Sequence, residues 1–159
     1  MRILLGLVAL SLAANVACTG ATTARASTTA STANAQAPTQ LTPQDLERRM
    51  KEIGTTFPAM RMRLMGGMTA DAVKDAQQLA TLFGDVERFW AQQSRADAVK
   101  WAQDARTFAT EVAGAATAGD VMKATQAANN MLASCKQCHG TYREVDPAGG
   151  FRIKAGVIQ

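Results

Sequence analysis

The chain has 159 residues, of which 47% are hydrophobic and only 5% aromatic, and it carries a formal net charge of +4. This length corresponds to one ordinary domain, and the alanine-rich, aromatic-poor composition favours closely packed helices over a β-sheet protein. The basic residues form no continuous run, which argues against a nucleic-acid partner.

The N-terminus is typical of an export signal. A short basic start precedes an apolar run at residues 3–14, which is too short to be a stable membrane anchor. Cys18 follows this run as in a bacterial lipoprotein, although Asn15 stands where leucine is usual. The alternative is an A-x-A cleavage site at residues 24–26, with Cys18 discarded. We expect a signal peptide at residues 1–17 and a periplasmic protein, either free or lipid-anchored through Cys18.

The segment after the signal has a different composition. Residues 21–40 are mostly Ala, Thr and Ser, and they include no large apolar residue. Such a segment buries too little surface to offset its chain entropy. We therefore expect a disordered tether at residues 18–41, a helical domain at 42–146 and a C-terminal tail at 147–159.

From residue 42 onward, apolar residues recur at helical spacing. Thr42 is predicted to cap the first helix, with Pro43 at its first position. Pro58 is expected to kink this helix, because it lacks a donor and crowds the preceding turn, and Gly66 and Gly67 to end it. The apolar stripe consists of Leu46, Met50, Ile53, Phe57, Met60 and Leu64.

Three further helices follow in the same pattern. Thr69 is predicted to cap the second, in which Gly84 is a candidate interruption. Ser94 is predicted to cap the third, with Asp97 in the capping-box position, and Asp120 to cap the fourth. Their apolar stripes are Val73, Ala76, Leu79 and Phe83; Ala98, Trp101, Ala105, Phe108, Val112 and Ala115; and Val121, Ala124, Ala128, Leu132 or Met131, Cys135, His139 and Tyr142.

Short connections between four helices favour antiparallel neighbours. The predicted fold class is therefore all-α, an up-down-up-down four-helix bundle. We predict no strands, and we expect the tail from Asp146 onward to be a loop.

Cys135, Cys138 and His139 form C-x-x-C-H, the attachment signature for c-type haem, near the end of the predicted fourth helix. Residues i and i+3 of a helix share a face, so each thiol can form a thioether with one haem vinyl group. His139, at i+4, projects from nearly the same side and can bind the iron. The predicted cofactor is one covalent haem c.

Other roles for these three side chains fit less well. A structural zinc site needs four ligands, and the remaining cysteine, Cys18, is remote in sequence. A thioredoxin-like pair needs a βαβ context, and a disulfide between i and i+3 of a helix would be strained. A lone histidine is usually structural, but here two adjacent cysteines and the export signal favour haem.

The haem segment resembles a known family. CKQCHGTYRE at residues 135–144, on the last helix of a bundle, resembles the cytochrome c-prime family of class II c-type cytochromes, including its low-spin Met-ligated members. MKEIGTTFPAM at 50–60 resembles the family's first-helix segment, and the resemblance covers about residues 42–144. It implies covalent haem on the last helix and Met50 at the sixth coordination position. It also implies that Arg143 lies near the haem, beside a propionate or the proximal imidazole; the alternative is a cation stabilising the helix C-terminus.

Helix geometry agrees with this position for Met50. In an antiparallel bundle the end of the fourth helix lies level with the start of the first, and Met50 is about two turns into that helix. Met60 lies roughly 15 Å further along the axis. The alternative role for Met50 is core filling. Leu46 and Ile53 flank it and are expected to line the distal side, with Tyr142 near the haem edge.

One position departs from the family pattern. The family often has a basic residue four positions before the distal ligand, where this chain has Leu46. Arg48 and Arg49 are candidates for the propionate contact, with solvation as the alternative. Lys51 is a poor ligand at neutral pH, and His139 is the only histidine.

The function expected from these residues is electron transfer by an exported mono-haem cytochrome with His139 and Met50 as axial ligands. The alternative is a five-coordinate cytochrome c-prime that binds nitric oxide or carbon monoxide. An accessory subunit of a larger complex is a third possibility. We expect no enzyme activity, because no distal histidine is present for acid–base chemistry. The expected partners are periplasmic redox proteins, and mild positive charge suits an acidic partner; a homodimer is left open.

Overall fold

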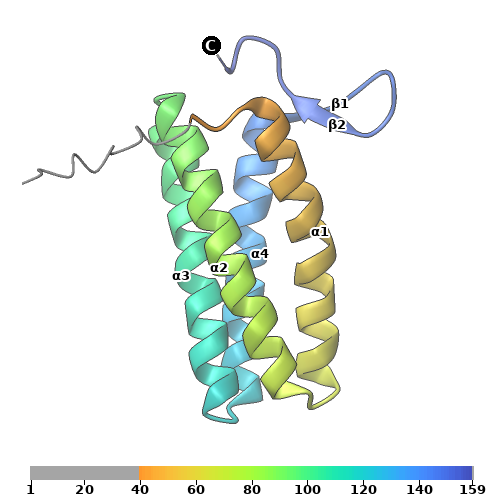
Figure 1. Ribbon diagram of the computed structural model, residues 1–159, viewed down its shortest axis with the longest axis vertical. Helices are drawn as coiled ribbons and strands as arrows, with labels where there is room; N and C mark the ends of the chain where they lie inside the picture. The colour runs from red at the N-terminus through yellow and green to blue at the C-terminus, as the bar shows by residue number, and fades with distance from the viewer. Residues whose placement is uncertain (1–39, 159) are drawn as a thin grey trace, which may run out of the picture. The chain divides into compact units, whose positions relative to one another are not determined.

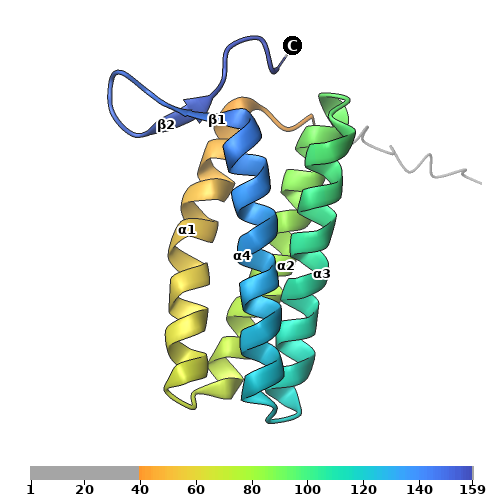
Figure 2. The ribbon, with the colours of Figure 1, turned by 180° about the vertical axis from the view of Figure 1, so that it is seen from behind.

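A computed structural model describes residues 40–158 and shows four α-helices followed by a short antiparallel hairpin (Figures 1 and 2). The predicted signal peptide and Cys18 lie outside the described residues, as does the expected tether apart from its last two residues. No helix within the described part is both long and apolar enough to cross a membrane. The elements are α1 (Pro43–Met65), α2 (Thr69–Gln92), α3 (Ala96–Thr117), α4 (Val121–Tyr142), β1 (Arg143–Val145) and β2 (Phe151–Ile153).

The helices form an up-down-up-down bundle, as the periodicity predicts. Each helix packs on the next along the chain, whereas α1 and α4 make far fewer contacts with one another. The α1–α2 and α3–α4 connections lie at one end of the bundle, and the hairpin lies at the other, beside the start of α1 (Figure 1). The start of α1 and the end of α4 are therefore level.

The core residues of α3 and α4 are largely alanine, whereas α2 buries mostly large side chains such as Leu79, Phe89 and Trp90. Small side chains let helix axes approach closely, because the interaxial distance depends on the residues at the contact. α1 contributes larger buried side chains, namely Leu46, Ile53, Met60 and Leu64. The buried alanines are Ala72, Ala76, Ala98, Ala102, Ala105, Ala109, Ala115, Ala116, Ala124, Ala127 and Ala128.

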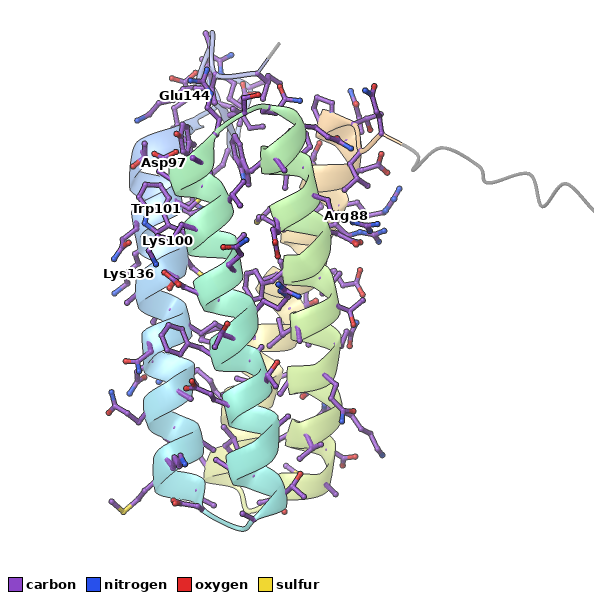
Figure 3. The ribbon with its side chains drawn as sticks, turned by 90° about the vertical axis from the view of Figure 1, so that its left-hand side faces the viewer. Arg88, Asp97, Lys100, Trp101, Lys136 and Glu144 are labelled. Carbon is purple, nitrogen blue, oxygen red and sulfur yellow. The ribbon has the colours of Figure 1, made fainter. Side chains whose placement is uncertain are left out.

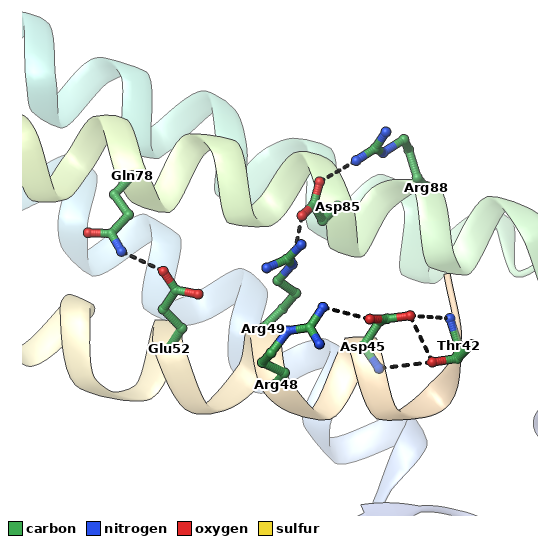
Figure 4. Close-up of polar contacts among 8 residues, drawn as sticks. All are labelled: Thr42, Asp45, Arg48, Arg49, Glu52, Gln78, Asp85 and Arg88. Carbon is green, nitrogen blue, oxygen red and sulfur yellow. Dashed lines mark hydrogen bonds and ion pairs between the residues drawn. The ribbon is translucent and has the colours of Figure 1, made fainter. Parts of the chain in front are cut away.

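Two of the predicted helix caps are confirmed. Thr42 Oγ1 accepts a hydrogen bond from the Asp45 amide (3.1 Å), and Asp45 Oδ2 accepts one from the Thr42 amide (2.9 Å), which forms a capping box (Figure 4). Asp120 Oδ1 accepts from the Lys123 amide at the start of α4. Each pair satisfies backbone N–H groups that have no partner within the helix.

The predicted caps of α2 and α3 are wrong. Their N-cap residues are Met68 and Arg95, and neither side chain makes a capping hydrogen bond. Ser94 has a left-handed backbone (φ +54°) in the α2–α3 turn, so it cannot take the extended conformation of an N-cap. Asp97 therefore forms no capping box with Ser94.

Neither Gly84 nor Pro58 ends its helix. α2 runs unbroken through Gly84, which packs opposite the Arg106 side chain of α3. α1 continues through Pro58, which lies on an exposed face. The carbonyl group that Pro58 leaves without a donor can there be hydrated, which reduces the cost of proline inside a helix.

The prediction of a tail without strands is wrong. β1 pairs with β2 in antiparallel register, with Arg143 opposite Ile153 and Val145 opposite Phe151. Lys154 Nζ donates to the carbonyl oxygens of Gly140 (3.1 Å) and Thr141 (2.7 Å). These carbonyls lie in the last turn of α4 and lack helical donors, so the returning tail caps the helix.

Ion pairs connect α1 to α2. Arg49 Nε lies 2.7 Å from Asp85 Oδ2, and Asp85 also pairs with Arg88 of its own helix (Figure 4). Arg63 pairs with Asp75, which is 8% exposed. The polar contacts of α1 therefore reinforce its packing on α2 rather than on α4.

The capping box gives a stability prediction. Replacing Thr42→Ala removes the acceptor for the Asp45 amide and should lower the free energy of unfolding by about 1 kcal/mol, measured by urea denaturation. The matched control is Thr55→Ala in the same helix, where the hydroxyl donates only to the Glu52 carbonyl; its effect should stay within about 0.5 kcal/mol. Equal effects of the two substitutions would show that the cap does not stabilise α1.

Candidate functional site

The last two turns of α4 carry the candidate site. Cys135, Cys138 and His139 are half-buried, and both cysteines are free thiols. The two thiol side chains pack against the hydrophobic core at the α4 end nearest the hairpin. A continuous helix therefore holds the three side chains at the predicted i, i+3 and i+4 spacing.

These three side chains line a small cavity of about 40 Å³. Met50 and Ile53 of α1 line the same cavity, so side chains from the first and last helices meet there. The remaining wall is contributed mainly by α2 and α3. It consists of Phe83, Val86, Trp101, Ala102, Ala105 and Ser134.

The structure therefore brings Met50 and Ile53 together with the C-x-x-C-H motif. Leu46 is buried in the core but is not a wall of the cavity. Tyr142 and Arg143 also lie outside it, although both are close to the end of α4. Of the two residues that flank Met50 on the α1 stripe, Ile53 lines the cavity and Leu46 does not.

Sequence reasoning did not identify the α2 and α3 walls. Phe83, Trp101 and Ala105 belong to the predicted apolar stripes, but a stripe does not show which of its residues lie level with His139. Val86 and Ser134 belong to no predicted stripe or motif, so the sequence does not mark them as part of a site. Trp101 lies on the side of the bundle where Lys136 of α4 is also found (Figure 3).

Tyr142 connects the end of α4 to the start of α3. Its Oη donates to Asp97 Oδ1 (2.6 Å), and its ring centroid lies 4.9 Å from that of Trp90. This hydrogen bond lowers the pKa of Asp97 below its ordinary value of 3.8 and raises the pKa of Tyr142 to about 12. The ring of Trp101, a wall of the cavity, lies 6.2 Å away. Tyr142 therefore lies next to a wall of the cavity without lining the cavity itself.

A second, open pocket of about 360 Å³ lies between α4 and the hairpin. His139 borders both this pocket and the small cavity. Arg143 also lines the open pocket, with its guanidinium 4.0 Å from the centroid of the Phe151 ring. His139 thus lies between the bundle interior and an opening that reaches solvent beside a cation.

The electrostatics favour uncharged forms of all three motif side chains. Burial, together with the positive charge of Arg143, lowers the pKa of His139. Burial raises the pKa of Cys135 to about 11 and, with the nearby charges, that of Cys138 to about 12. At neutral pH the site therefore offers a neutral imidazole and two protonated thiols.

This arrangement does not suit a zinc ion. Zinc binds thiolates and requires convergent ligands. Within residues 40–158 no group of three His, Cys, Asp or Glu side chains converges on a point where a metal ion could lie. The helical spacing instead spreads the two thiols and the imidazole along one face.

The donor set does suit a covalently attached haem. It offers two thiols and one neutral imidazole on α4, with a thioether across the cavity on α1 and apolar walls between them. The cavity itself is smaller than typical cofactor pockets, which are about 300–1,000 Å³. A porphyrin would require this cavity to widen, and α1 and α4 are the neighbouring helices with the fewest mutual contacts.

The two candidate propionate partners on α1 are engaged elsewhere. Arg48 pairs with Asp45 (2.6 Å) and Arg49 with Asp85. Lys51, the disfavoured ligand, is exposed and pairs with Glu47. None of these three lines the cavity. The basic residues that line the open pocket beside His139 are Lys136 and Arg143.

The Tyr142–Asp97 bond predicts a pH profile for stability. Because the pKa of Asp97 is lowered in the folded state, its carboxylate stabilises the protein above pH about 3.8, and this stabilisation is lost as pH falls. Because the pKa of Tyr142 is raised, its hydroxyl stabilises the protein below pH about 10, and this stabilisation is lost as pH rises toward about 12. The advantage of wild type over Tyr142→Phe should therefore be constant near neutrality and shrink at both extremes, measured by urea denaturation across pH.

The matched variant Asp97→Asn has no carboxylate to titrate. Its difference from wild type should show the same loss at low pH. A difference between wild type and Tyr142→Phe that does not vary with pH would mean that this hydrogen bond is absent in solution.

Comparison of the chain with protein-family models, with curated proteins and with solved structures finds no match. The resemblance to cytochrome c-prime therefore rests on the motif residues and their predicted placement.

Proposed function

We propose that this chain is an exported mono-haem c-type cytochrome that transfers electrons, similar to low-spin members of the cytochrome c-prime family. The main support is that Cys135, Cys138 and His139 of α4 share one cavity with Met50 of α1. Among the cavity walls the only titratable groups are those of the motif itself. Such a site favours holding a cofactor over acid–base chemistry on a substrate.

Cys135 and Cys138 would hold the porphyrin covalently. Each attachment adds the S–H bond of one cysteine across a vinyl C=C bond. The sulfur bonds one carbon and the hydrogen goes to the other, so no oxidant or reductant is consumed. The high pKa values of the buried thiols keep them in the protonated form that supplies this hydrogen.

His139 and Met50 would be the axial ligands. The lowered pKa of His139 keeps its imidazole lone pair available at neutral pH. Thioether sulfur from Met50 favours the reduced iron and raises its potential. When bound, the haem supplies one-electron redox chemistry. The apolar walls limit access of water, which favours electron transfer over ligand exchange.

The open pocket beside His139 suggests where electrons would enter and leave. Lys136 and Arg143 line it and form no ion pair with a carboxylate within the described residues. Glu144 also lines the pocket but pairs with Arg152, so the unpaired charge there is positive and suits an acidic redox partner. Export to the periplasm belongs to the same proposal, with the protein either free or lipid-anchored through Cys18.

Covalent attachment is tested by removing the thiols. In cells able to mature c-type cytochromes, the exported wild type should keep porphyrin absorbance after denaturation and acidic solvent extraction. The double variant Cys135→Ala, Cys138→Ala should lose it, because both thioether bonds are gone.

Ser134→Ala is the matched control, since Ser134 lines the same cavity without a thiol. It should retain the covalent chromophore. A colourless wild-type protein with the mass of the unmodified chain and free thiols would refute the cytochrome proposal.

Axial ligation is tested with a pair of methionines on α1. Met50→Leu should convert a low-spin ferrous spectrum to a high-spin one that takes up carbon monoxide at once. Met60→Leu, at a fully buried position that does not line the cavity, should leave the spectrum unchanged. Both swaps conserve volume, so each should cost less than about 1.5 kcal/mol of stability.

The same spectra distinguish the alternative function. If wild-type ferrous protein is already high-spin and binds carbon monoxide, Met50 is not a ligand. The protein would then be a five-coordinate, gas-binding cytochrome rather than an electron carrier.

A further inference from the structure

The α1–α2 corner lies at the end of the bundle opposite the hairpin (Figure 2). Three exposed methionines lie at this corner. Met62, Met65 and Met68 are 62%, 74% and 51% exposed, and they stand within seven residues of one another. Single exposed apolar residues are ordinary on protein surfaces. Three thioethers in one helix-terminal turn are a cluster that hydrophobic burial does not explain.

The backbone of the corner holds these three residues together. Met62 and Met65 are three residues apart in the last turns of α1, so they share a face. The Met68 amide donates to the Arg63 carbonyl (2.9 Å) across the Gly66–Gly67 turn, in which Gly67 has φ +73°. This bond brings Met68 back against the end of α1.

The Met68 side chain also folds back over α1. A methyl group added at Gly66 would lie 3.4 Å from Met68 Cε and 3.3 Å from the Met62 carbonyl oxygen. Met68 Cε therefore lies beside the turn that carries Met62 and Met65. Gly66 leaves the space that this approach needs.

Methionine at position 68 does not help the fold locally. It is the N-cap of α2 and makes no capping hydrogen bond, whereas Ser, Thr, Asp or Asn would stabilise the helix by about 1 kcal/mol. Met62 and Met65 bury little surface on α1. Positions where local stability is not optimised are often functional.

We propose that Met62, Met65 and Met68 form a binding site for a soft monovalent cation, Cu(I). Thioether sulfur is a soft ligand that selects Cu(I) over hard divalent ions. Of the two arginines that flank Met62, Arg63 is neutralised by its ion pair with Asp75, and the charged Arg61 lies over the ring of Phe57. The three thioethers are neutral and carry no proton to lose, so affinity should be independent of pH between about 5 and 8.

This site is independent of the haem proposal. It lies at the far end of α1 from Met50, and it uses none of the motif residues. The experiment uses the exported protein after its free thiols have been blocked with N-ethylmaleimide, so that cysteines do not compete for the metal.

The direct test observes the sulfur-bound methyl groups. Protein labelled with ¹³C at the methionine methyls is titrated with Ag(I), a redox-inert substitute, and then anaerobically with Cu(I). The resonances of Met62, Met65 and Met68, assigned with single Met→Leu variants, should shift together and saturate at one ion per chain. The resonance of Met122, which is 85% exposed on α4, should not shift.

The triple variant Met62→Leu, Met65→Leu, Met68→Leu keeps the apolar surface and removes the sulfur. It should lose saturable binding, whereas Met122→Leu should bind as wild type does. The proposal is overturned if no methyl resonance of the three shifts, if the triple variant binds as well as wild type, or if Met122→Leu weakens binding equally. Haem content is read separately from absorbance, so failure of either proposal leaves the other intact.

Discussion

The close packing of α3 on α2 and α4, which its buried alanines allow, is the constraint on which the rest of the structure depends. The small side chains of α3 let it approach α2 and α4 closely, and α1 completes the bundle as its fourth helix. Antiparallel order then places the start of α1 level with the end of α4. The meeting of Met50 with Cys135 and His139 at one cavity follows from this alignment.

The contacts of α1 are unevenly distributed between its neighbours. Ion pairs of Arg49 and Arg63 with α2 carboxylates supplement its apolar packing on that helix, while its contacts with α4 are sparse. The α1–α4 seam is therefore the part of the bundle that can open at the lowest cost. The proposed cofactor would require the cavity to widen, and this seam has the fewest contacts to break.

The end of α4 is held from several directions. Lys154 caps its last carbonyls, Tyr142 bonds Asp97 of α3, and Arg95 donates to the Val157 carbonyl of the tail (2.8 Å). These contacts restrict the helix turn that carries His139. A rigid support of this kind reduces the reorganisation needed when a side chain acts as a ligand.

Local patterns in the sequence were sufficient to predict the four helices and the caps at Thr42 and Asp120. They also predicted that Cys135, Cys138 and His139 share one helix face. These features depend only on residues that are close in sequence. Antiparallel order also predicted that Met50 lies level with His139. Only tertiary structure decided the walls from α2 and α3, the exclusion of Leu46 from the cavity and the hairpin that caps α4. Those features depend on how helices rotate and shift against one another, and on contacts such as that of Lys154 with the end of α4, which no local pattern encodes.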